Sequence, residues 1–247
     1  MAKSAFSIDT FHCPKEGLSE DDYEDASCVL ETENGYRIAI ADGATESSYS
    51  KLWASLLVES FVRSEEPLPD FLYKLDDARR VWKEHVSKKK LAWYAEEKAG
   101  LGAFAAFLGL SIDPVSRRWE AVAVGDCCLF QLDPGRRGFR LIEAFPLKES
   151  RDFGFNPYLV GTSEEKTSEV SQYIRTYSGT IRPDDVFLLA SDAVAAWLLK
   201  RKELRLPVWG TMSEIDSQEQ FEALVESARG DGLHNDDSTL VRLVFRG

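Results

Sequence analysis

Cysteine and histidine are scarce in this chain. Only four cysteines and three histidines occur among its 247 residues. No two cysteines have the CxxC spacing of a zinc site or redox motif, and Cys127 and Cys128 are adjacent. We therefore expect neither a disulfide framework nor a zinc site, but reduced thiols in a cytoplasmic protein.

Long apolar segments and linkers are also absent. The apolar runs Ala103–Leu110 and Val186–Ala190 are far shorter than the stretch of about 20 residues that crosses a bilayer. Residues 1–10 lack the basic and apolar regions of a signal peptide. Because no Gly/Ser-rich or Pro-rich linker and no repeat divides the chain, we expect a single domain over residues 1–247. Residues 146–171 are polar and weakly periodic, which indicates a flap inserted at one edge.

Positive charge is in deficit. Thirty Lys and Arg residues stand against 42 Asp and Glu residues, which gives a net charge of −12 at pH 7. Such a surface repels nucleic-acid phosphates and anionic lipids alike. The one basic run, Lys88–Lys90, is interpreted as the solvated end of a helix. We therefore expect no nucleic-acid or membrane partner, and we expect a monomer.

Apolar and polar residues alternate in several segments bounded by turn residues, a pattern typical of antiparallel strands. Asn34-Gly35, between two such segments, is the strongest hairpin signal. Asp113-Pro114 and Asp133-Pro134-Gly135 mark two further turns. Strands are predicted over Ala26–Glu31, Tyr36–Ala41, Phe104–Ile112, Trp119–Val124, Cys127–Leu132, Phe139–Phe145, Tyr173–Thr180, Val186–Ser191 and Thr239–Phe245.

Four other segments carry apolar residues at helical spacing. In the last of them, Gln220 follows Ser217 by three residues and forms a capping-box pattern. The order of strands and helices predicts an α+β fold in which two packed antiparallel β-sheets are covered by helices. The helices are predicted over Lys51–Arg63, over Asp70 to about Lys89 with Asp70 as the cap, over Ala193–Leu204, and onward from Ser217.

Five aspartates lie at or near the ends of predicted strands. Asp25 precedes the first predicted hairpin and Asp42 follows it, so antiparallel pairing brings both to one end. Asp192 and Asp236 share an end if their strands pair, and Asp126 interrupts an apolar run. One such aspartate is more often a turn former, but five converging carboxylates repel one another unless a hard cation lies between them. Ligands that are all oxygens favour magnesium or manganese over zinc.

The segments around these aspartates resemble, in order, the motifs of the type 2C metal-dependent protein phosphatases, the PPM family. Leu188–Asp192 is similar to the family's Leu-Leu-Ala-Ser-Asp-Gly motif. In Asn235–Thr239, Thr239 marks Asp236 as the metal-ligand position of the family's Asp-Asn-x-Thr motif. Six matches in the family's order span nearly the whole chain. The other four are Glu24-Asp25-Ala26, Ala41-Asp42-Gly43, Gly102–Ala106 and Val124-Gly125-Asp126.

The resemblance implies a four-layer αββα sandwich, with two antiparallel sheets flanked by helix pairs. It also implies the hydrolysis of phosphoserine or phosphothreonine in a phosphorylated protein substrate, with Mn²⁺ or Mg²⁺ as cofactor. Asp42 would bridge two metal ions, and the Gly43 carbonyl would bind one of them. Asp192 and Asp236 would complete the coordination of the other ion.

The same resemblance gives roles to the remaining acids. Glu24 and Asp25 would hold metal-bound water, and Asp126 with Asp192 would hold a weaker third ion. A water of lowered pKa would attack phosphorus in line, so no covalent phosphoenzyme is required. The implied catalytic residues are Asp42, Asp126 and Asp192.

The chain departs from the family where phosphate is handled. The acidic residues Glu20–Asp22 stand where the family has an Arg that grips phosphate, and Ala44–Glu46 replaces the His or Met and the glycines after Asp-Gly. Ala193 replaces a Gly, and Cys127 replaces a Ser. The occupied acidic positions favour an active enzyme of a divergent, bacterial branch. The departures favour a phosphatase-like regulatory binding module with little turnover, and a small-molecule phosphomonoesterase is a third alternative.

Overall fold

The structure is a computed structural model of the chain. It describes residues 6–45, 49–65, 68, 70–73, 75–88, 102–136, 138–154, 157–163 and 171–246. One group of strands is β1 (Phe6–Cys13), β6 (Cys128–Gly135), β7 (Gly138–Phe145), β10 (Val186–Ala190) and β11 (Ser238–Phe245). The other is β2 (Ala26–Thr32), β3 (Gly35–Gly43), β4 (Phe104–Asp113), β5 (Arg118–Val124), β8 (Val160–Gly161) and β9 (Arg175–Thr180). The helices are α1 (Ser50–Arg63), α2 (Asp76–Ser87), α5 (Asp192–Glu203), α6 (Trp209–Glu214) and α7 (Gln218–Arg229), with 3-10 turns η1 (Glu20–Asp22), η2 (Asp70–Tyr73), η3 (Ser150–Asp152) and η4 (Ser171–Tyr173).

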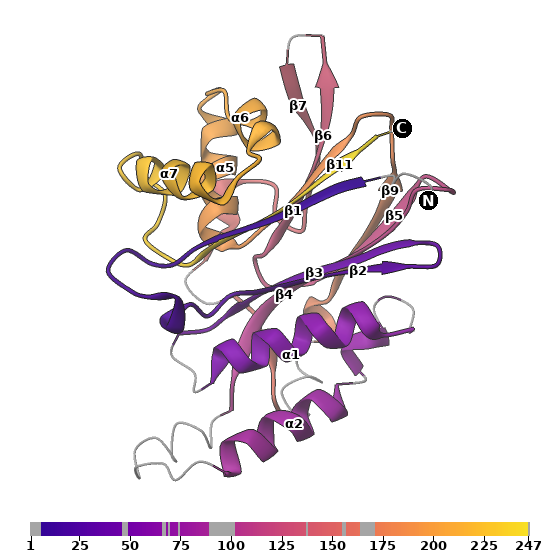
Figure 1. Ribbon diagram of the computed structural model, residues 1–247, viewed down its shortest axis with the longest axis vertical. Coiled ribbons are helices and arrows are strands. Elements are labelled where there is room, and N and C mark those ends of the chain that lie inside the picture. The colour runs from indigo at the N-terminus through magenta and orange to yellow at the C-terminus, as the bar shows by residue number, and fades with distance from the viewer. Residues whose placement is uncertain are drawn as a thin grey trace.

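The strands form two sheets. The first has the order β1-β11-β10-β6-β7, and the second has the order β2-β3-β4-β5-β9, with β8 beside β4. All pairings between these strands are antiparallel. Figure 1 shows α1 and α2 on one side of the molecule and α5, α6 and α7 on the other. The predicted α+β fold of two antiparallel sheets with helices outside them is confirmed.

Apolar side chains fill three interfaces between the four layers. Between the sheets, residues of both, such as Ile38 and Leu243, form one cluster. The outer face of the first sheet packs on α5, α6 and α7, with Phe221 at the centre. The outer face of the second sheet packs on α1 and α2. On α1, the predicted stripe of Trp53 and Phe61 is fully buried, which fixes the helix against that sheet.

Strand β1 was not among the predicted strands. It pairs with β11 along its whole length, from Phe6 opposite Phe245 to Cys13 opposite Ser238. Its buried residues do not keep a period of two, because Phe6 is buried, the next four residues are not, and burial resumes at Phe11 and Cys13. The strand matters for the site because it delivers the segment that follows Cys13 to the carboxylates.

Two further predictions need correction. The single helix predicted from Asp70 to about Lys89 is instead η2 followed by α2, and Asp70 does not cap α2. The break falls at Leu75, whose φ of −96° and ψ of 12° are not helical and whose side chain is fully buried. Residue 89 lies outside the described residues. The predicted strand Tyr173–Thr180 begins only at Arg175, after η4, and α6 adds a helix to the α5–α7 layer.

The segment predicted to be a flap is only partly described. Residues 146–154 and 157–163 contain η3 and β8, and β8 pairs with β4 of the second sheet. That this segment is an insertion stays a prediction. Among the described helices, none is both long enough and apolar enough to span a membrane.

Candidate metal centre

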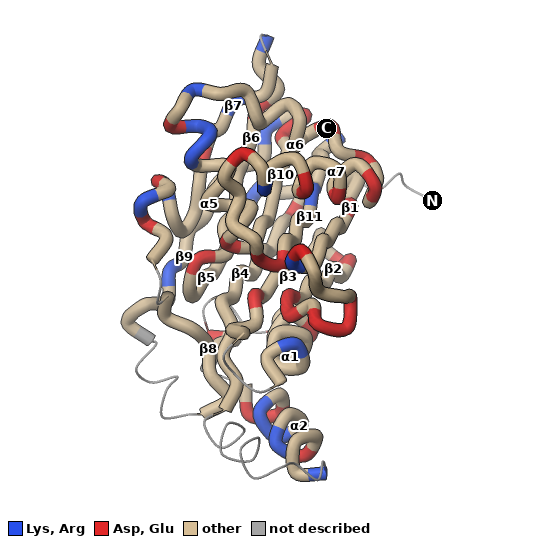
Figure 2. The backbone as a smooth tube through the Cα atoms, turned by 90° about the vertical axis from the view of Figure 1, so that its left-hand side faces the viewer, with Lys and Arg blue, Asp and Glu red and all other residues tan. Residues whose placement is uncertain are grey.

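Two strand pairs bring the acidic residues to one place. In the β2–β3 hairpin Ala26 lies opposite Ala41, so Asp25 and Asp42 share an end. In the β10–β11 pair Ala190 lies opposite Leu240, so Asp192 and Asp236 also share an end. The hairpin belongs to the second sheet and the other pair to the first. In Figure 2 acidic residues (red) gather around the end of β3 and above α1.

A pocket of about 570 Å³ opens between these ends. Its walls include Phe153 and Leu159 from the segment after β7, together with Ala44 and Thr45 after β3. Glu24 and Asp25 are not part of its lining, and Asp25 is buried with 5% of its surface exposed. Five of the seven predicted site residues line the pocket: Asp42, Gly43, Asp126, Asp192 and Asp236.

Asp25 is held by a hydroxyl group of the first sheet. Thr239 Oγ1 of β11 donates a hydrogen bond of 2.6 Å to Asp25 Oδ2. Burial, together with repulsion from Asp237 and Asp192, nevertheless raises the pKa of Asp25 to about 7. A buried carboxylate with this much neighbouring negative charge favours a cation nearby.

The pocket carboxylates repel one another in the same way. Burial and the charge of Asp236 raise the pKa of Asp192. Burial, and then repulsion from Asp25, Asp192, Asp126 and Asp236, raises the pKa of Asp42 well above its usual range. Burial and the charge of Asp192 raise the pKa of Asp126 to about 7. A bound cation would offset the repulsion between these carboxylates, as it does where carboxylates share a metal ion.

The carboxylate oxygens around the pocket are ligands that suit hard divalent cations, although the side chains do not meet at one point. In the part of the chain that the structure describes, no three Asp, Glu, His or Cys side chains are arranged to hold an ion. Asp192 Oδ1 accepts a hydrogen bond from the Ala193 N–H, and Asp236 Oδ1 accepts one of 2.7 Å from the Asp237 N–H. The carboxylates around the pocket supply oxygen alone, which is the chemistry that Mg²⁺ and Mn²⁺ prefer.

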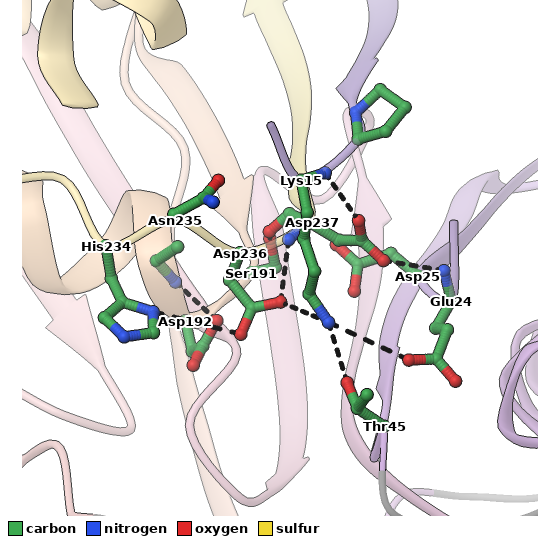
Figure 3. Close-up of polar contacts among 12 residues, drawn as sticks. Lys15, Glu24, Asp25, Thr45, Ser191, Asp192, His234, Asn235, Asp236 and Asp237 are labelled. Atoms are coloured by element: carbon green, nitrogen blue, oxygen red, sulfur yellow. Dashed lines mark hydrogen bonds and ion pairs between the residues drawn. The ribbon is translucent and has the colours of Figure 1, made fainter. Parts of the chain in front are cut away.

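Lys15 is a site residue that sequence reasoning missed. Its Nζ lies 3.0 Å from Asp236 Oδ1, 2.7 Å from Thr45 Oγ1 and 3.8 Å from Glu24 Oε2 (Figure 3). One signal could have found it, because Lys15 is the only Lys or Arg between residues 4 and 36, a strongly acidic stretch. Glu24 is further engaged by the hydroxyl of Ser50, which donates to Glu24 Oε1.

Asp237 was also overlooked, and it ties the site together rather than lining it. Its Oδ1 accepts a hydrogen bond of 3.0 Å from the Lys15 N–H, and its Oδ2 accepts one of 2.7 Å from the Glu24 N–H. Figure 3 shows Asp237 between these two segments. His234 lines the pocket with an exposed side chain, its Nδ1 4.0 Å from Asp236 Oδ2.

Comparisons with known proteins bear on the fold. No family model matches the chain, and no curated protein matches its sequence. A solved bacterial serine phosphatase matches with a TM-score of 0.64 and 13% identity, covering 98% of each chain. The photosystem II phosphatase PBCP matches with a TM-score of 0.62 and 15% identity, covering 97% of this chain and 98% of that one. The Mycobacterium tuberculosis serine/threonine phosphatase PstP matches with a TM-score of 0.61 and 16% identity, covering 98% of this chain and 99% of the other.

These matches extend over almost the full length of both partners in each comparison. PstP has been solved with two manganese ions, and the similar protein RsbX with magnesium. Identities of 13–16% establish shared architecture and leave activity to be tested. The predicted resemblance is confirmed at the level of the fold: the chain has the fold of the type 2C metal-dependent serine/threonine phosphatases.

Proposed function

We propose that this chain is a metal-dependent phosphatase that hydrolyses phosphoserine or phosphothreonine in proteins. One observation carries the proposal. The carboxylates of Asp42, Asp126, Asp192 and Asp236, which come from both sheets, line one pocket in a chain with a phosphatase fold. Their mutual repulsion, which raises the pKa of Asp42, is the electrostatic setting that divalent cations relieve.

The proposed ligands divide into two groups. Asp42, the Gly43 carbonyl, Asp192 and Asp236 would hold two Mn²⁺ or Mg²⁺ ions, and Asp126 would hold a weaker third with Asp192. Glu24 and Asp25 would accept hydrogen bonds from water. Ions held there would supply a water of lowered pKa as the nucleophile and would neutralise phosphoryl oxygens.

The remaining residues of the site position this set. Thr239 holds Asp25 through its hydroxyl, and Asp237 fixes the backbone of Glu24. Phe153 and Leu159 give the pocket an apolar wall that limits the access of bulk water. Each of these contacts restricts where a carboxylate can lie, which is how a protein orients groups for an in-line attack.

The substrate class and setting are further parts of the proposal. Structures with this fold are described as serine or serine/threonine phosphatases, which supports a phosphoprotein substrate. All four cysteines are free thiols, which supports a reducing cytoplasm. We also propose a monomer.

A second candidate is a phosphatase-like binding module with little turnover. The ion pair of 3.0 Å between Lys15 and Asp236 favours it, because an ammonium group there occupies a proposed metal ligand. The two candidates differ in whether product forms when Mn²⁺ is supplied.

The test is phosphate release from a phosphothreonine peptide, a phosphotyrosine peptide and p-nitrophenyl phosphate, each with Mn²⁺. We expect multiple turnovers on the phosphothreonine peptide and less on the phosphotyrosine peptide. Release from p-nitrophenyl phosphate alone would indicate a small-molecule phosphomonoesterase. Binding of the phosphopeptide without release from any substrate would support the binding module.

A further inference from the structure

The segment that carries Lys15 is hydrogen-bonded to the loop before β11. The Lys15 N–H donates to Asp237 Oδ1 at 3.0 Å, and the Glu16 N–H donates to Asn235 Oδ1 at 2.8 Å. Arg229 Nη2 donates to the Pro14 carbonyl at 2.6 Å. Lys15 and Glu16 are therefore fixed to that loop, and Pro14 is fixed to the end of α7. This anchoring sets the direction of the Lys15 side chain toward the carboxylates, as Figure 3 shows.

The ammonium group of Lys15 lies within the site rather than on an open surface. Only 15% of its side chain is exposed, and its Nζ contacts Asp236, Glu24 and Thr45. The contacts with Asp236 and Thr45 use two of the three N–H donors of the ammonium, and Glu24 at 3.8 Å adds an ion pair. Burial lowers the pKa of Lys15, but the bond to Asp236 and the charges of Asp236, Asp237 and Glu24 outweigh it and raise the pKa overall. The group is thus a fixed positive charge.

The Lys15 ammonium forms ion pairs on one side of the pocket. Among the described residues, ion pairs with lysine reach Asp236 and Glu24, whereas none reaches Asp42, Asp126 or Asp192. The two sides of the site therefore differ in how readily they accept a cation.

We propose that the Lys15 ammonium is a built-in competitor for one of the divalent cations: an ion that binds Asp236 must first displace it. The inference rests on the proposed metal centre. Asp236 Oδ1 cannot keep a contact of 3.0 Å with an ammonium and also bind a divalent cation without close repulsion between the two positive charges. Of the two core ions, the one that does not bind Asp236 binds first, and the one that binds Asp236 binds more weakly because Lys15 has to move.

The experiment measures Mn²⁺ affinity and stoichiometry, by calorimetry and by the electron paramagnetic resonance signal of free Mn²⁺, without substrate. Lys15→Met removes the charge and keeps most of the stem. We expect the weaker ion to bind at least about tenfold more tightly in this variant, a change of about 1.4 kcal/mol. Lys15→Arg keeps the charge and should retain the weak affinity.

Lys51→Met is the matched control. It removes the same charge near the site, but among the described residues the hydrogen bonds of Lys51 Nζ go to the backbone carbonyls of Glu20 and Asp21, at 2.9 and 3.4 Å. Its Mn²⁺ affinity should stay within about twofold of wild type, since an exposed charge is largely screened. In an Asp236→Asn background, Lys15→Met should no longer strengthen binding, because the contested ligand is gone.

The outcomes separate this inference from the proposed function. If wild type binds Mn²⁺ and Lys15→Met binds it no more tightly, Lys15 is no competitor, and the metal centre stands. If neither protein binds Mn²⁺, both the inference and the metal centre are wrong. Should Lys15→Met fail to fold by circular dichroism, Lys15→Gln decides by the same criterion.

Discussion

Thr239 on β11 donates a hydrogen bond of 2.6 Å to Asp25, which directly precedes β2 in the other sheet. Because the single hydroxyl hydrogen of Thr239 goes to Asp25, the Tyr23 hydroxyl must be the donor in its own contact with Thr239. The hydrogen-bonded series Tyr23–Thr239–Asp25 connects distant parts of the sequence, since Asp25 and Thr239 are 214 positions apart. It joins the two sheets directly below the pocket.

Removing the Thr239 hydroxyl tests this link. Thr239→Val keeps the shape but leaves the Asp25 carboxylate and the Tyr23 hydroxyl each short of a partner. We expect the free energy of unfolding to fall by about 1–3 kcal/mol, measured by urea denaturation. Thr239→Ser keeps the hydroxyl and should lose less. A Thr239→Val protein as stable as wild type would show that the link contributes nothing.

Replacing a proposed ligand should separate activity from stability. Asp42→Asn and Asp192→Asn each remove one of two carboxylates that repel each other. We expect no phosphate release from a phosphothreonine peptide, together with a Tm in chelator equal to or above that of wild type. Phosphate-release assays and thermal unfolding in chelator measure the two effects. Wild-type rates in these variants would exclude the proposed site.

Asp126 should behave differently from the other acids, because the proposal gives it only to a third, weaker ion. Asp126→Asn should keep two Mn²⁺ sites in calorimetry. Its turnover should fall more on phosphopeptides than on p-nitrophenyl phosphate, whose acidic leaving group hardly needs protonation. Equal losses on both substrates would contradict a role at the leaving group. Loss of all Mn²⁺ binding would place Asp126 among the core ligands.

Asp185, which precedes β10 at the end opposite Asp192, allows a stability prediction with a pH dependence. It is fully buried, and its Oδ2 accepts hydrogen bonds from Gln131 Nε2 and the Arg182 N–H, at 2.5 and 2.8 Å. Its Oδ1 has no partner among the described residues. Burial raises its pKa, so its ionised form destabilises the fold at neutral pH.

Asp185→Asn keeps an acceptor for both donors and removes the charge. We expect Tm at pH 7 to rise by about 2–4 °C, the shift that about 1 kcal/mol gives a chain of this size. A carboxyl whose pKa is raised by folding adds stability as pH falls through that pKa. Wild type should therefore recover relative to the variant between pH 7 and about 4.5 in calorimetric scans. Asp184→Asn, which changes the exposed neighbour of Asp185, should show no such change of Tm difference with pH. A Tm difference between Asp185→Asn and wild type that stays constant with pH would contradict the mechanism.

The sequence was informative wherever structure follows from nearby residues. The turn signal at Asn34-Gly35 located the β2–β3 hairpin, although Gly35 pairs with Thr32 and the turn lies at Glu33-Asn34, so Asp25 and Asp42 could be placed at one end. The capping box at Ser217 likewise located the start of α7, where the Gln220 N–H donates to the Ser217 hydroxyl. In these cases the local pattern and the tertiary packing agree.

The parts that were missed depend on contacts between distant residues. Lys15 reaches the site because its backbone bonds to Asp237, 222 residues away, and no local pattern encodes that contact. β1 lies beside β11 although its own alternation is broken. The break at Leu75 follows from burial of that side chain, which helical periodicity alone cannot anticipate. Departures from local rules near a site are expected where function shapes the sequence.

The central claim is that hydrolysis depends on cations held by these carboxylates. The most direct measurement is phosphate release from a phosphothreonine peptide by one protein preparation, before chelation, after chelation, and after Mn²⁺ is restored, with Asp42→Asn in parallel. We predict that wild-type release stops on chelation and returns with Mn²⁺, whereas Asp42→Asn stays inactive throughout. Release that continues undiminished after thorough chelation would contradict the account.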